Sequence, residues 1–267
     1  MHDMHKTDIL TACENELVSF EKMIKDEPYQ LRGILNSEAL LIVAIAKQLG
    51  VKHIIESGRA RGHSTNLIAK LFQDDDAMKI TSIDIDNKTA DAKFSEAKLK
   101  KFPNVNLIYG DSFKLISGII RENCIVFIDG PKGEPALELT GKLLEDKRVK
   151  AVLVHDLHKN TFPRNISEII FQKHFFTDDA DFVKRFGSLD QNCWKVMENT
   201  GYKPYTRADK NVLSYGHTLG VFFNESEPYV EPQYKNYIEH RTASKESIRG
   251  LLTKEIMKIV YAIRLRT

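Results

Sequence analysis

The sequence predicts an α/β fold built on a doubly wound parallel sheet. From residue 51 onwards, short apolar runs alternate with longer amphipathic ones, at the lengths expected of strands and helices. Two apolar runs, Ile-Val-Phe-Ile and Ala-Val-Leu-Val, lack polar alternation, which is typical of strands buried on both faces. We therefore expect a Rossmann-like, mostly parallel sheet with helices on both faces, N-terminal helices and a C-terminal helical tail.

Two helices are expected before the sheet. Residues 7–25 place apolar side chains at mostly helical spacing, which predicts one amphipathic helix. A second helix is expected from Ser37, as its N-cap, to Gly50, because glycine suits a C-terminal stop.

The alternating region predicts five strands and four helices. The strands are expected at residues 53–56, 80–84, 105–108, 124–129 and 151–155, and the helices at residues 64–72, 89–100, 112–121 and 135–147. After residue 158 the pattern weakens, and we expect a helix at 166–176, a late strand at 213–223 and a helix at 244–265. The chain is thus divided into an N-terminal helical segment (1–50), an α/β domain (51–223) and a C-terminal linker and amphipathic helix (224–267).

The composition of the chain limits which partners it can be expected to bind and in which cell compartment it is expected. Lys and Arg number 39 against 37 Asp and Glu, and a net charge of +2 gives no reason to expect nucleic acid. Three widely spaced cysteines support neither a disulfide framework nor a CxxC zinc site, which favours a reducing cytoplasm. The longest apolar run, residues 39–46, is far shorter than the ~20 residues of a transmembrane helix, and residues 1–25 lack a signal peptide's apolar stretch. We expect a cytoplasmic protein without a membrane span.

The predicted C-terminal helix carries seven apolar residues on one stripe. A stripe of that size usually marks an interface, so we expect a homodimer. Its basic residues leave peripheral membrane contact as the alternative.

Acidic residues end the five predicted strands or follow them closely. They are Glu56, Asp84, Asp111, Asp129 and Asp156. An unpaired acid is costly to bury, so core packing does not explain this pattern. Ligands of open parallel sheets lie at the carboxyl ends of the strands, and these acids therefore mark the expected site.

The first strand-to-helix turn favours an amino-acid-bearing ligand. Its glycines, Gly58 and Gly62, are four residues apart, so the GxGxxG dinucleotide fingerprint is absent. The free N–H groups of the following helix, with Ser64, suit a carboxylate, and Glu56 is available for an ammonium. Arg59 and Arg61 either bind an anion or are solvated.

Five motifs in order at the strand ends resemble the class I S-adenosylmethionine-dependent methyltransferases. They are Glu-x-Gly-x-x-x-Gly-x-Ser from Glu56, Ile-Asp-Ile-Asp from Ile83, Gly-Asp-Ser from Gly110, Ile-Asp-Gly-Pro-Lys from Ile128 and Val-His-Asp from Val154. The sequence is most similar to the O-methyltransferase branch that includes catechol O-methyltransferase-like and sugar- or antibiotic-tailoring enzymes. The resemblance covers roughly residues 34–223.

The resemblance implies roles for the strand-end residues. S-adenosylmethionine would be held at its methionine part by Glu56, Gly58, Gly62 and Ser64, at its ribose by Asp84, and at its adenine by Asp111, Ser112 and Phe113. Asp86 is expected only to cap the next helix.

For metal-dependent members, the resemblance implies Asp129 and Asp156 as ligands of a divalent cation and Lys132 as the base. The family's usual Asp-Asn pair on the fifth strand is Asp156-Leu157 here, which removes one oxygen ligand. Two carboxylates still suffice for Mg²⁺ or Mn²⁺. A metal-bound hydroxyl loses its proton more easily, and His155 or His158 is the alternative base.

We expect an O-methyltransferase that acts on a small hydroxylated molecule or a sugar. One alternative is a non-catalytic, cofactor-binding or scaffolding member of the same fold. A second, an NAD-binding oxidoreductase, is disfavoured by the glycine spacing and by the lack of a suitable Tyr-x-x-x-Lys pair.

Overall fold

The computed structural model describes residues 4–31, 33–200 and 218–224. The chain divides into a unit of residues 1–226 and a second of residues 227–267, and only the first contains described residues. Three expectations lie outside the described residues. They are the C-terminal helix, residues 213–217 of the late strand and the peripheral membrane alternative. The boundaries at residues 50 and 223 stay a prediction.

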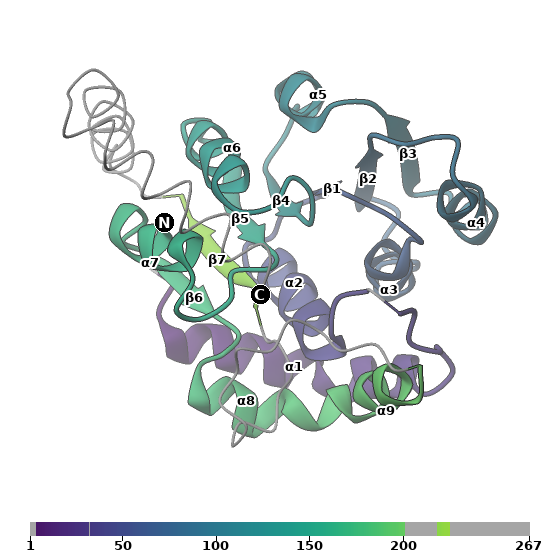
Figure 1. The fold of residues 1–267 in the computed structure, drawn as a ribbon, viewed down its shortest axis with the longest axis horizontal. Helices are drawn as coiled ribbons and strands as arrows, with labels where there is room; N and C mark the ends of the chain where they lie inside the picture. The colour runs from purple at the N-terminus through teal and green to yellow at the C-terminus, as the bar shows by residue number, and fades with distance from the viewer. Residues whose placement is uncertain (1–3, 32, 201–217, 225–267) are drawn as a thin grey trace. The chain divides into compact units, whose positions relative to one another are not determined.

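The predicted mostly parallel sheet is confirmed. Among the described residues it has seven strands in the order β3-β2-β1-β4-β5-β7-β6 (Figure 1). Strands β1 to β5 run parallel, and β7 is antiparallel to both β5 and β6. The strands span His53–Ser57 (β1), Lys79–Asp84 (β2), Val105–Tyr109 (β3), Cys124–Ile128 (β4), Val149–Val154 (β5), His174–Phe176 (β6) and Gly220–Phe223 (β7).

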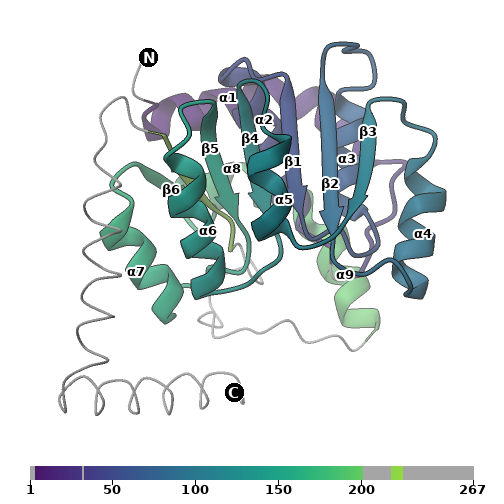
Figure 2. The same ribbon diagram turned by 90° about the horizontal axis from the view of Figure 1, so that it is seen from above.

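Helices cover both faces of the sheet. Helices α5 and α6 lie on one face, α2 and α3 lie on the other with α1 outside them, and α4 flanks the β3 edge (Figures 1 and 2). The helices span Lys6–Ile24 (α1), Asn36–Gln48 (α2), His63–Leu71 (α3), Ala90–Leu99 (α4), Ser112–Ile119 (α5), Glu134–Leu144 (α6), Phe162–Ile170 (α7), Ala180–Phe186 (α8) and Gln191–Asn199 (α9), with a 3₁₀ turn at Gly187–Asp190.

The apolar run at residues 39–46 is the centre of the core. Every residue of this run in α2 is at most 1% exposed. It packs with sheet residues such as Phe127 and Leu153, which are neighbours in the parallel register of β4 and β5. The run is therefore a helix buried between α1 and the sheet, which explains why it is apolar on all sides.

Two local expectations are wrong. The helix expected at 166–176 ends at Ile170, and residues 174–176 form β6 against β7, where Phe175 and Phe176 are buried. Ser37 is not the N-cap of α2, since that position belongs to Leu35. The Ser37 hydroxyl instead donates to Asp190 Oδ2 at 2.7 Å, tying α2 to the 3₁₀ turn.

None of the described helices is long and apolar enough to cross a membrane.

Candidate functional site

The parallel register brings the acidic strand ends to one edge of the sheet. Ser57 of β1 pairs with Ile83 on one side and Ile128 on the other, and Ile128 pairs with Val154. The residues just beyond these positions therefore surround a common region, as the sequence predicts.

Glu56 lies beneath the first turn and is fully buried. Its carboxylate accepts hydrogen bonds from the hydroxyls of Ser64 and Thr65, and from Ser82 Oγ at 2.5 Å. Burial raises the pKa of Glu56, and the three hydroxyls oppose that rise. Both carboxylate oxygens have partners within the protein, so Glu56 fixes the turn instead of facing open space.

The two glycines of the turn are required by its geometry. Gly58 has φ +91°, and a Cβ there would lie 2.7 Å from the backbone nitrogen of Gly130. Gly62 has φ +71° and is the N-cap residue of α3, packed against Leu99. Gly58 thus lets the β1 turn touch the chain after β4, while Gly62 starts the helix.

Asp84 holds the same turn from the end of β2. Its Oδ2 accepts hydrogen bonds from the backbone N–H groups of Arg59 and Ala60, both at 2.9 Å. Asp86 is exposed, and its carboxylate accepts from the N–H groups of Lys88 and Thr89 just before α4. Asp86 therefore orders the residues before α4, while Asp84 holds the turn after β1.

The third strand end forms the start of α5. Asp111 is the N-cap residue, and its Oδ1 accepts from the N–H of Phe113 at 3.0 Å. Ser112 and Phe113 are the first helical residues and are half-buried.

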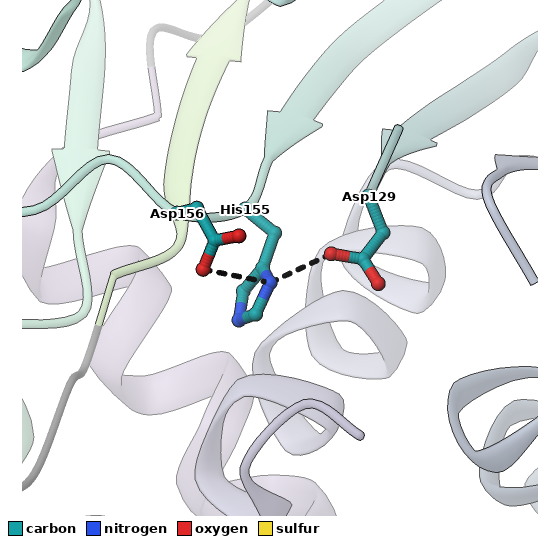
Figure 3. Close-up of side chains that lie close together, drawn as sticks. All are labelled: Asp129, His155 and Asp156. Atoms are coloured by element: carbon teal, nitrogen blue, oxygen red, sulfur yellow. Dashed lines mark hydrogen bonds and ion pairs between the residues drawn. The ribbon is translucent and has the colours of Figure 1, made fainter. Parts of the chain in front are cut away.

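A charged cluster lies beyond β4 and β5 (Figure 3). His155 Nδ1 is 2.7 Å from Asp129 Oδ1 and 3.5 Å from Asp156 Oδ1, so its ring sits between the two carboxylates. The Lys132 ammonium contacts Asp129 and lies 2.8 Å from Asp156 Oδ2. His158 Nε2 is farther away, 3.8 Å from Asp156 Oδ1.

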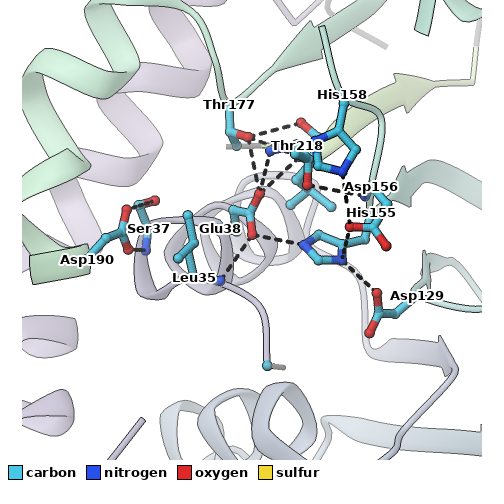
Figure 4. Close-up of polar contacts among 12 residues, drawn as sticks. Leu35, Ser37, Glu38, Asp129, His155, Asp156, His158, Thr177, Asp190 and Thr218 are labelled. Atoms are coloured by element: carbon cyan, nitrogen blue, oxygen red, sulfur yellow. Dashed lines mark hydrogen bonds and ion pairs between the residues drawn. The ribbon is translucent and has the colours of Figure 1, made fainter. Parts of the chain in front are cut away.

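Glu38 supports this cluster from α2 (Figure 4). It is fully buried, and its Oε2 lies 3.2 Å from His155 Nε2. The same carboxylate accepts hydrogen bonds from the N–H groups of Leu35, Thr218 and Leu219, at 3.0, 2.8 and 3.0 Å. One side chain thus links the start of α2, the start of β7 and the site.

The candidate bases differ in their protonation. Burial acts to lower the pKa of His155, but Asp129, Asp156 and Glu38 raise it well above its ordinary value. Burial of Lys132 is likewise outweighed by Asp129 and Asp156, and its pKa is raised. Burial lowers the pKa of His158, against the attraction of Asp156. Of the three, only His158 has a lowered pKa.

The donor set at the end of β4 and β5 fits a divalent cation. Asp129, His155 and Asp156 each offer one ligand atom, and these atoms lie within 4.8 Å of one another. Leu157 is fully buried and has no oxygen to offer a cation. The site therefore offers two carboxylates and one imidazole.

Three important side chains were not predicted. Glu38 falls only within the expected second helix, and Ser82 only within the strand expected at residues 80–84. The third is His63, which is 4% exposed and whose ring nitrogens have no hydrogen-bond partner. Its ring packs against Gly33 and meets the ring of Tyr29 edge-on. No local pattern marks Glu38 or Ser82, because both act on residues distant in the sequence.

Comparison with protein families gives one match over the centre of the chain. Residues 55–157, which run from β1 to just past β5, match the family model described as a methyltransferase domain. This match agrees with the predicted methyltransferase family over residues 55–157. No curated protein matches the sequence.

The chain is also similar to solved structures of low sequence identity. A Podospora anserina methyltransferase bound to SAH is 16% identical, covers 84% of this chain and 90% of its own, and has a TM-score of 0.44. An O-methyltransferase from Bacillus cereus in complex with SAH is 13% identical, with coverage of 82% and 90% and a TM-score of 0.41. TomG of Streptomyces achromogenes, an O-methyltransferase in complex with SAM, is 13% identical, with coverage of 84% and 93% and a TM-score of 0.42.

Proposed function

We propose that the chain is an S-adenosylmethionine-dependent O-methyltransferase, a proposal supported by the match of residues 55–157 to the methyltransferase-domain model. Its substrate class is a small hydroxylated molecule or a sugar. The observation that carries the proposal is the contact at Gly58, where the turn expected to hold the cofactor touches the backbone of Asp129 and Gly130, within the charged cluster. A methyl donor at the turn and an acceptor at the cluster would therefore be neighbours.

The cofactor half is formed by β1, β2 and β3. The N–H groups at the start of α3 would bind the methionine carboxylate, and Asp84 would accept hydrogen bonds from the ribose hydroxyls. Asp111, Ser112 and Phe113 would border the adenine. Glu56 organises this half through Ser64, Thr65 and Ser82, which is a positioning role and not the direct ammonium contact expected from sequence.

The acceptor half is formed by β4 and β5. Methyl transfer to an alcohol needs the hydroxyl proton to leave, and we assign its removal to His158, whose lowered pKa leaves the ring neutral near pH 7. Lys132, held as a cation by Asp129 and Asp156, neutralises the carboxylates or the oxygen that loses its proton. A divalent cation held by Asp129 and Asp156 would lower the pKa of the acceptor hydroxyl.

This charged cluster favours an enzyme over a scaffolding protein. A binding module has no need for a neutral His158 beside Asp156, in a cluster whose two carboxylates are 20% and 38% exposed. Such partly exposed, strongly coupled groups are typical of sites where protons move.

The test is methyl transfer itself, measured as S-adenosylhomocysteine release with a panel of phenols, sugars and other small alcohols. Asp84→Ala should weaken S-adenosylhomocysteine binding at least about tenfold, since hydrogen bonds to a charged acceptor contribute ~1.5–3 kcal/mol. Asp86→Ala, which removes an exposed acid two residues away, is the matched control and should change the affinity less than about twofold. Equal affinities for the two variants would remove Asp84 from the site.

We also propose that the enzyme acts in the cytoplasm as a homodimer. The three cysteines are buried and free, which is consistent with a reducing compartment. The apolar stripe expected at residues 244–265 is the proposed interface. Light scattering on the full chain and on a chain ending at Asn224 tests it, and two monomers of equal stability would overturn the homodimer.

A further inference from the structure

We propose that His155 is a nitrogen ligand, through Nδ1, of a divalent cation that Asp129 and Asp156 also bind, and that buried Glu38 orients it. The site would then select cations that accept imidazole, such as Mn²⁺ and Co²⁺, over Mg²⁺. This inference rests on the proposed function, because it specifies the metal at the acceptor half of that site.

The first argument is where the two ring nitrogens point. Nδ1 faces both carboxylates, at 2.7 Å from Asp129 Oδ1 and 3.5 Å from Asp156 Oδ1 (Figure 3). Nε2 faces away from them, towards Glu38. Nδ1 is hydrogen-bonded to Asp129 in this structure, and a cation bound between the ring and the two carboxylates would replace the Nδ1 proton.

The second argument is the partner of the remote nitrogen. Histidines that bind metals usually donate their other ring N–H to a carboxylate, which fixes the tautomer and the ring orientation. Glu38 Oε2, 3.2 Å from Nε2, has this position. With its Nε2 proton held by Glu38, the ring would present the Nδ1 lone pair to the cation.

Glu38 is itself buried and held by several hydrogen bonds. The N–H groups of Leu35, Thr218 and Leu219 hold a carboxylate that is fully buried (Figure 4). Such rigid support costs conformational freedom, and a solvated surface histidine would not require it.

The choice of metal follows from the donor types. Carboxylates and water alone suit Mg²⁺, whereas an imidazole favours first-row transition metals, for which Co²⁺ binds more tightly than Mn²⁺. We therefore expect an order of affinity of Co²⁺, then Mn²⁺, then Mg²⁺. A site without His155 would lose most of this preference.

The experiment measures metal binding directly, by calorimetry with Mn²⁺, Co²⁺ and Mg²⁺ and by pulsed electron paramagnetic resonance of the Mn²⁺-loaded full chain. Wild type should show coupling of Mn²⁺ to an imidazole nitrogen. His155→Asn should abolish that coupling and weaken Mn²⁺ and Co²⁺ at least about tenfold, with less than about a threefold change for Mg²⁺. His158→Asn, the same change at the other histidine of this loop, should keep the coupling.

Glu38→Gln should weaken the binding of Co²⁺ and Mn²⁺ about 10- to 100-fold, provided that the variant folds. If the variant does not fold, His155→Asn provides the test. Failure of wild type to bind Mn²⁺, or Mn²⁺ binding without a nitrogen coupling, overturns the inference. A coupling lost in His158→Asn but kept in His155→Asn also overturns it. S-adenosylhomocysteine titrations on the same samples test the proposed function separately, because the cofactor half does not use His155.

Discussion

The two halves of the sheet's carboxyl edge use similar acids in opposite ways. At β1 and β2, Glu56 and Asp84 accept hydrogen bonds from neutral hydroxyl and amide donors. At β4 and β5, Asp129 and Asp156 face the cationic side chains of His155 and Lys132. Neutral donors fix a loop in one geometry, whereas coupled charges leave groups that can exchange protons or bind a cation. The partner of a strand-end acid, more than the acid itself, indicates its role.

The largest effect is expected at the charged half. His158→Asn should lower kcat by about 100- to 10,000-fold, the usual contribution of a general base, while S-adenosylhomocysteine affinity stays unchanged. Since burial lowers the pKa of His158, the wild-type rate should rise with pH through a value below the ordinary histidine range. Steady-state kinetics check both points. A kcat within about threefold of wild type would remove His158 from the chemistry and return the choice to Lys132 and His155.

The contact between the halves is tested by Gly58→Ala. The added Cβ would lie 2.7 Å from Gly130 N in a residue with φ +91°, so the substitution should cost about 2–5 kcal/mol of unfolding free energy. Gly50→Ala is the matched control, because Gly50 also has positive φ, +60°, but has open space around its Cβ position. It should cost only about 1–2 kcal/mol. Urea unfolding measures both, and equal costs would mean that the halves do not touch tightly.

The free energy of unfolding should fall in acid because of His63, at the start of α3 beside the β1 and β2 half of the site. Burial lowers the pKa of His63 to about 3, and the folded state therefore disfavours its protonated form. A depressed histidine pKa leaves stability intact above the unfolded pKa and reduces it as the pH falls through that value, by ~1.4 kcal/mol per pH unit.

His63→Phe keeps a ring against Tyr29 and removes this titration. From pH 7 to pH 5 the wild type should lose about 2 kcal/mol more unfolding free energy than the variant. Urea unfolding at the two pH values gives the difference. An identical pH dependence would show that His63 is not buried in the unprotonated form.

The smallest effect is expected from Lys132→Ala. The ammonium contacts both carboxylates of the proposed metal site but is 47% exposed, and pairs of this exposure contribute only ~0.2–1 kcal/mol each. Removing this competing cation should tighten Mn²⁺ binding about two- to tenfold in calorimetry. Weaker Mn²⁺ binding would instead show that Lys132 helps to hold the metal. The two halves of the site would then differ less than we propose.

The sequence predicts the parallel strands well because their signals are local. Buried parallel strands are short apolar runs, and helix starts such as that after Gly62 follow a recognisable turn. The short strand β6 has no clear local signal, because only residues 171–173 separate it from α7 and its identity depends on pairing with β7 far along the chain.

The same distinction applies to the site. Acids at strand ends are predictable, since the parallel register alone brings Asp84, Asp129 and Asp156 to one edge. Glu38 was not, because it reaches His155 from α2, 117 residues away, through tertiary packing. The sequence therefore identifies which acids lie at the carboxyl edge of the sheet, and the structure shows which donors face them.

The central claim is that the glycine turn and Asp84 hold S-adenosylmethionine and not a dinucleotide. Calorimetry of the wild-type chain with S-adenosylhomocysteine and, separately, with NAD tests it most directly. We predict one S-adenosylhomocysteine bound per chain and no measurable heat with NAD. Tight binding of NAD without binding of S-adenosylhomocysteine would contradict the claim.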